Sequence, residues 1–111
     1  MASIIDLEDG LGRLQGSKAL YKRMLNLFLQ SKEPAQFEQA LADNDLEQAS
    51  AAMHSIKGVA GNLGLTALFE SSSVLMTQLK EGVANSDLID GYRAILKDTQ
   101  EAAKDLIAQF A

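Results

Sequence analysis

The apolar residues of this chain recur at steps of three and four positions, which is the spacing of amphipathic α-helices, and strand-like alternation is hard to find. The first two predicted helices span residues 6–14 and 17–30, and a third begins at Pro34. The next runs from a capped start at 44–47 to Gly64, and it is followed by one from residue 65 or 66 to Gly82. The last predicted helix extends from a cap at Ser86 through Phe110. Pro34 suits a first helical turn, where its missing N–H would be unpaired in any case.

The three long C-terminal helices each carry one apolar stripe. The first comprises Leu46, Ala49, Met53, Ile56, Ala60 and Leu63. The second comprises Leu65, Leu68, Phe69, Ser72, Leu75, Met76 and Leu79, and the third Tyr92, Ile95, Leu96, Thr99, Ala103, Leu106 and Phe110. Short connections make successive helices antiparallel neighbours. We therefore expect an all-α fold, an antiparallel up-down four-helix bundle with one or two short extra helices at the N-terminus, in one domain of residues 1–111.

Composition narrows the possible functions. A length of 111 residues fits one compact domain. A net charge of −5 argues against nucleic-acid binding, and the lack of cysteine excludes disulfides and thiolate metal sites. No apolar run approaches the ~18 residues that cross a bilayer, so no direct membrane contact is expected. We expect a cytoplasmic protein, and a monomer because the apolar stripes are used within the bundle.

His54 is the only histidine, and its helical position is informative. At about 100° per residue, His54 lies off the apolar stripe on a solvent-facing flank. The other residues of this flank are Glu47, Ser50, Ala51, Lys57, Gly58 and Gly61. Each glycine inside a helix lowers the stability of that helix by about 0.5–1 kcal/mol. We expect that the two glycines are nevertheless present because they let another surface approach the imidazole. Two alternatives remain: a merely solvated His54, and glycines that serve helix packing, which is less plausible for Gly58 than for Gly61.

Lys57 lies one helical turn after His54, on the same flank. A positive charge there would favour a neutral ring, as a nucleophile requires, and would pair with an anion attached to that ring. The alternative is an ordinary surface lysine.

The run from His54 to Gly64, HSIKGVAGNLG, resembles the signature of the histidine phosphotransfer (HPt) domains of bacterial multistep phosphorelays. The resemblance covers nearly the whole chain and is strongest over residues 45–81. It implies that His54 accepts and donates a phosphoryl group, that Lys57 stabilises the phosphate, and that Gly58 gives a receiver domain room to dock. Many family members carry Gln or Glu in the next helix, reaching toward the histidine; this chain has Met76 at the aligned position and Gln78 nearby.

The resemblance also implies the partners. These are the receiver domains of a hybrid sensor kinase or of a response regulator, which would supply Mg²⁺. Gly10, Gly12 and Gly16 have the wrong spacing for a dinucleotide loop, and we interpret them as turn glycines. We therefore expect a phosphocarrier with no ATP site, no metal and no cofactor of its own, and not an enzyme by itself. Both a free shuttle and a cytoplasmic domain of a membrane-bound sensor kinase fit this expectation.

Helical domains also have three other functions, which fit this sequence less well. The closest is the phosphotransfer domain of a chemotaxis-type kinase, phosphorylated from ATP by its kinase domain; residues after Gly61 fit the phosphorelay group better. A di-iron bundle needs paired Glu-x-x-His motifs, but Ala51 stands three residues before His54. The third is a helical adaptor without chemistry.

Overall fold

A computed structural model describes residues 4–110, which contain six α-helices and no strand. They are α1 (Leu7–Arg13), α2 (Lys18–Leu29), α3 (Glu33–Ala42), α4 (Leu46–Leu63), α5 (Thr66–Lys80) and α6 (Ser86–Gln109). The predicted all-α class is confirmed. Residues 1–3 and 111, the ends of the predicted domain, lie outside the described residues.

Side-chain caps set the helix starts. The Ser17 hydroxyl accepts the Leu20 N–H at the start of α2, and the Asp45 carboxylate accepts the Gln48 N–H at the start of α4. The predicted cap at Ser86 is wrong, because the Asn85 side chain accepts the N–H groups of the second and third residues of α6, while Ser86 is already helical.

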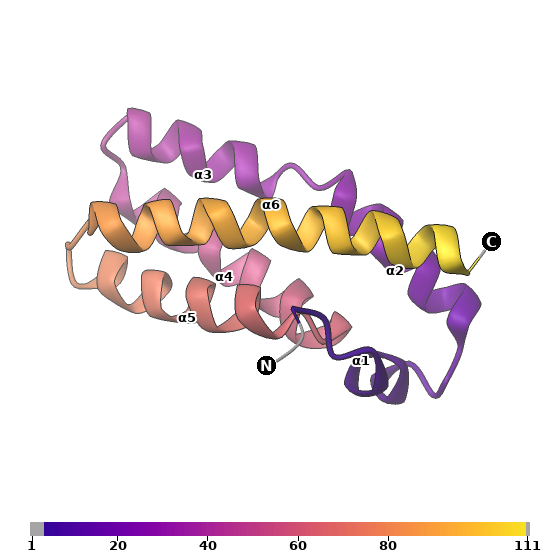
Figure 1. Cartoon of the computed structure of the whole chain (residues 1–111). Helices are drawn as coiled ribbons and strands as arrows, with labels where there is room; N and C mark the ends of the chain where they lie inside the picture. The colour runs from indigo at the N-terminus through magenta and orange to yellow at the C-terminus, as the bar shows by residue number, and fades with distance from the viewer. Residues whose placement is uncertain (1–3, 111) are drawn as a thin grey trace.

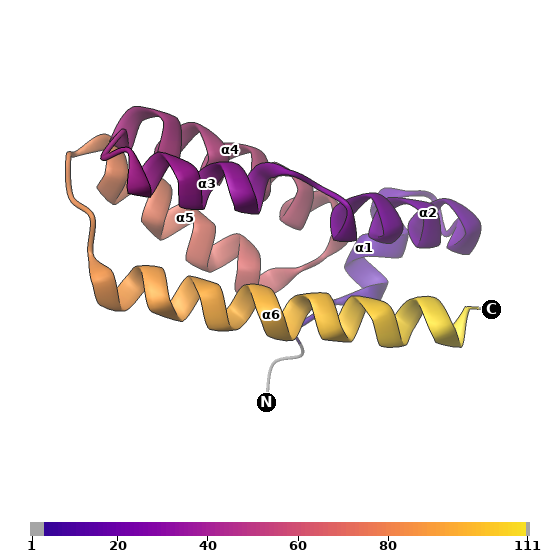
Figure 2. The same ribbon diagram turned by 90° about the horizontal axis from the view of Figure 1, so that it is seen from above.

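The helices α2 to α6 run lengthwise along the molecule, whereas the short α1 crosses this direction (Figures 1 and 2). The α2 and α3 helices follow each other almost end to end, and α6 extends along most of the molecule (Figures 1 and 2). The chain turns back after α3, after α4 and after α5 (Figure 1). The α4 helix packs against α1, α2, α3 and α5, which makes it the central element.

The predicted stripe of α4 forms much of the core. Ala49, Met53, Ile56, Ala60 and Leu63 are buried. Gly64 then ends the helix with a φ of +70°, as predicted from the glycine at this position. The Tyr21 hydroxyl donates to the Leu63 carbonyl oxygen at 2.6 Å, which ties α2 to the end of α4.

Two predictions about packing are wrong. The apolar stripe places Phe69 in the core, but this residue is 38% exposed, because its ring lies against Gly61 and Lys57 of α4 at the rim of the interface. Gly10 is not a turn glycine: it lies inside α1, where a Cβ would come within 2.5 Å of the Leu63 carbonyl oxygen. A glycine is needed there because α1 closely approaches the end of α4.

Candidate functional site

His54 lies in the middle of α4 on its solvent side. The neighbouring residues Met53 and Ile56 are buried, whereas the His54 side chain is exposed. The angular placement predicted from the sequence is therefore confirmed. This placement follows from the helical repeat, which directs the side chains of Met53 and His54 toward different surroundings.

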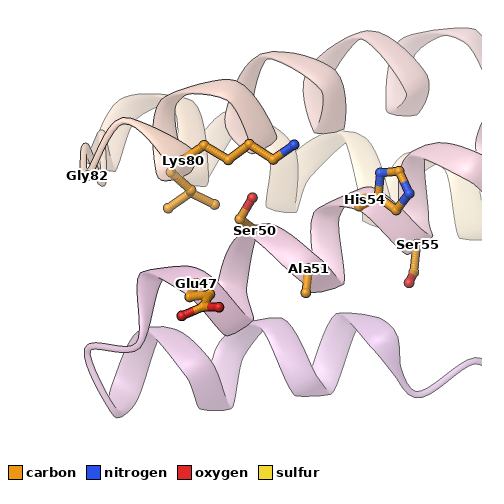
Figure 3. Close-up of a pocket in the computed structure, with 8 residues that line it drawn as sticks. Glu47, Ser50, Ala51, His54, Ser55, Lys80 and Gly82 are labelled. Carbon is orange, nitrogen blue, oxygen red and sulfur yellow. The ribbon is translucent and has the colours of Figure 1, made fainter.

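An open pocket of about 760 Å³ lies beside the His54 ring (Figure 3). Its walls come from α4 and from the end of α5, two segments that pack against each other. The lining residues are Glu47, Ser50, Ala51, His54, Ser55, Leu79, Lys80 and Gly82. The structure thus brings His54 together with Glu47, Ser50 and Ala51 of the predicted flank.

Ser50 differs from the expectation of an exposed flank residue. It is only 5% exposed, and its hydroxyl donates to the Met76 carbonyl oxygen at 3.3 Å. The reason is that Ser50 lies on the edge of the flank nearest to α5, where the two helices meet. This hydrogen bond joins α4 to α5 at the level of Met76.

Lys57 makes its contact outside the pocket. Its side chain is half-buried, and Nζ lies 5.6 Å from the centroid of the Phe69 ring on α5. Such a cation–π contact is worth about 0.5–1 kcal/mol at an exposed position. The described residues that line the pocket do not include Lys57. Its predicted role as the phosphate-stabilising cation stays a prediction.

The two flank glycines have different surroundings. A Cβ on Gly58 would meet nothing within 4 Å, whereas a Cβ on Gly61 would lie 3.2 Å from the Phe69 ring. Gly61 therefore serves the packing of Phe69, which is the alternative left open for it. Gly58 serves no packing among the described residues, and its lack of a side chain leaves the surface beside His54 open.

The polar residue expected from α5 is absent at the aligned position. Met76 contributes its carbonyl oxygen to Ser50 but no polar side chain. Gln78 is half-buried, and its Oε1 has no hydrogen-bond partner among residues 4–110. The described lining of the pocket includes neither side chain.

Sequence reasoning missed Lys80, which lines the pocket from the last position of α5. The signal was present: Lys80 follows Met76 by four residues and so lies on the same face of that helix. The sequence does not specify the position of α5 along α4, so it does not show that Lys80 reaches the pocket beside His54.

Other kinds of site find little support in the described part of the chain. Within residues 4–110, no group of three or more His, Asp or Glu side chains could hold a metal ion. No helix among these residues has the length and apolar character to cross a membrane.

The comparison with known families gives a match over most of the chain. The family model described as "Hpt domain" matches residues 23–109, which include α3 to α6 and most of α2. No curated protein and no solved structure matches the chain significantly.

Proposed function

The chain belongs to the Hpt-domain family, and from this membership we propose that His54 carries a phosphoryl group between the aspartates of two receiver domains in two-component signalling. The observation that supports this most strongly is the sole imidazole of the chain, exposed beside an open pocket with free space at Gly58.

The chemistry is a pair of displacements at phosphorus. A lone pair on a neutral ring nitrogen of His54 attacks the phosphorus of an aspartyl phosphate, and an N–P bond forms. The P–O bond to aspartate breaks, and the carboxylate leaves with the bonding electrons. In the second step the carboxylate of another receiver attacks the phosphorus, and the imidazole leaves.

The two proteins have different tasks in this scheme. The partner receiver would supply an acidic pocket that binds Mg²⁺, and this cation would offset the negative charge on the transferring group. This chain supplies a fixed nucleophile and room for approach. We propose that Glu47, Ala51 and Gly58 meet the receiver directly, since all three are exposed around His54. Ser50 and Gly61 then support this face from below.

We also propose the arrangement that presents His54. The α2–α3 segment, α4, α5 and α6 act as the four antiparallel members of a bundle, with α1 as the short extra helix, in a monomer. A cytoplasmic location follows from the proposed receiver partners. The functional unit is then one elongated domain with the nucleophile half-way along its central helix.

One labelling experiment separates a phosphorelay from the chemotaxis-type alternative. The protein is incubated with labelled ATP and a purified kinase core, with and without a receiver domain. We expect label on the protein only when the receiver is present, because phosphoryl groups arrive as aspartyl phosphate. Equal labelling by the kinase core alone would favour the chemotaxis-type kinase, and no labelling under either condition would contradict phosphotransfer.

A further inference from the structure

The pocket beside His54 is lined by one residue of each charge, Lys80 and Glu47. A phosphoryl group on the ring carries close to two negative charges in a chain whose net charge is already −5. Positive charge for that group must therefore come from particular side chains, since the protein as a whole repels it.

Lys80 points toward the ring. Figure 3 shows its side chain extended through the pocket, with Nζ as the end nearer to His54. Helix geometry explains this direction, because side chains lean toward the N-terminus of their own helix. The α5 helix runs back along α4 (Figure 1), so the Lys80 side chain leans toward His54 (Figure 3).

The hydrogen bond between Ser50 and Met76 marks the level at which the two helices lie beside each other. Ser50 precedes His54 by one turn of α4, and Lys80 follows Met76 by one turn of α5. His54 and Lys80 therefore lie on opposite sides of this hydrogen bond, and the Lys80 side chain extends past Ser50 toward His54 (Figure 3). The apolar Met76 side chain leaves Lys80 as the cation that α5 offers to the pocket.

The Lys80 ammonium group is available. Among residues 4–110, the ion pairs involve Arg13 and Arg93, and neither Lys80 nor Glu47 takes part in one. Lys57, by contrast, rests on the Phe69 ring outside the pocket.

From this geometry we infer that Lys80 binds the phosphoryl group carried by His54 and so stabilises the phosphorylated form. The inference rests on the proposed function of His54 and names a residue of that site which the sequence motif does not contain. Lys80 holds the phosphoryl oxygens in their deprotonated form, which slows the acid-promoted cleavage of the N–P bond.

The test loads His54 chemically, without any receiver or kinase. Phosphoramidate is the donor: a ring nitrogen attacks phosphorus, the N–P bond to His54 forms, the donor's P–N bond breaks, and ammonia leaves with the bonding electrons. The phosphorylated protein is purified, and its decay at neutral pH is followed by phosphorus NMR. The variants are Lys80→Gln, Lys80→Arg and, as a control with the same charge change on α6, Lys97→Gln.

We expect Lys80→Gln to shorten the phosphohistidine half-life about three-fold, as for the loss of one exposed ion pair. Lys80→Arg should restore most of the half-life, and Lys97→Gln should leave it unchanged. Added salt should shorten the half-life of the native protein toward that of Lys80→Gln, since screening weakens the pair. A purely structural role of Lys80 would produce neither the rescue nor the salt effect.

Three results would overturn the inference. They are an unchanged half-life in Lys80→Gln, an equal loss in Lys97→Gln, and a native protein that accepts no phosphoryl group from phosphoramidate, since the ring must be open to the pocket. The proposed function is tested separately by transfer from a receiver, so a failure of the Lys80 inference can be told apart from a failure of the proposed function.

Discussion

At the residue scale, the properties of the site depend on side chains that are absent as much as on those present. Gly58 and Gly91 are both exposed and both lie inside helices, and a Cβ added to either would meet nothing within 4 Å. Only Gly58 lies beside His54. Comparing substitutions at Gly58 and Gly91 therefore separates the effect of a helical glycine on stability from its effect on the access of a partner to His54.

Replacing Gly58 with leucine should slow phosphoryl transfer from a receiver by at least about ten-fold, because a side chain there displaces the docking partner. The same change should raise the free energy of unfolding by up to about 1 kcal/mol, since leucine is the better helix former. Stopped-flow transfer kinetics and urea unfolding measure the two effects.

Gly91→Leu is the matched control for this variant. It should give the same gain in the free energy of unfolding and leave transfer unchanged. Transfer at the native rate by Gly58→Leu would refute the access role of Gly58.

The sequence alone predicts His54 and its exposure, because both depend only on the identity of residues and on the repeat of one helix. It does not predict the contributions of Ser50, Phe69 and Lys80. These depend on how far α5 is displaced along α4, a quantity determined by packing over the entire interface and not by any local pattern.

At the element scale, the helix positions follow from apolar spacing and from caps, and most boundaries agree with the predictions. The start of α6 shows the limit of this approach. Asn85 and Ser86 are adjacent and both belong to residue types that cap well. Asn85 is the residue that caps α6, because its backbone is extended and its side chain accepts two backbone N–H groups.

Asn85→Ala should lower the free energy of unfolding by about 0.5–2 kcal/mol, the usual cost of losing a cap. Ser86→Ala should leave it within about 0.5 kcal/mol of the native value, as for an exposed surface change. Urea unfolding followed by circular dichroism compares the two variants, and a larger loss in Ser86→Ala would reverse the assignment.

At the scale of the whole molecule, two buried tyrosines join helices that are distant in the chain. Tyr21 donates to the end of α4, whereas the Tyr92 ring packs edge-on against Phe37 with 5.2 Å between centroids. The Tyr92 hydroxyl has no hydrogen-bond partner among residues 4–110. Burial raises the pKa of Tyr21 from 10.0 to about 12, with a further contribution from the Asp6 and Asp9 carboxylates. Burial also raises the pKa of Tyr92.

A raised pKa in the folded state means that folding favours the neutral phenol. The contribution of Tyr21 to stability is therefore complete below pH 10 and is lost as the pH rises toward 12. Tyr21→Phe should cost about 1–3 kcal/mol at neutral pH, because the Leu63 carbonyl oxygen loses its partner, and should flatten the alkaline loss of stability. Urea unfolding at several pH values measures both effects.

Tyr92→Phe is the control for the hydrogen bond. Since its hydroxyl is unpaired among the described residues, its removal should cost less than that of the Tyr21 hydroxyl at neutral pH. Equal costs for the two variants would contradict the assigned link between α2 and α4.

The most direct measurement of the central claim is to locate the phosphoryl group after incubation with a phosphorylated receiver domain, by mass spectrometry of peptides kept in base. The account predicts one acid-labile phosphoryl group, on the peptide that contains His54, and no label on a His54→Gln variant of unchanged helicity. A phosphoryl group on any other residue, or equal labelling of His54→Gln, would contradict it.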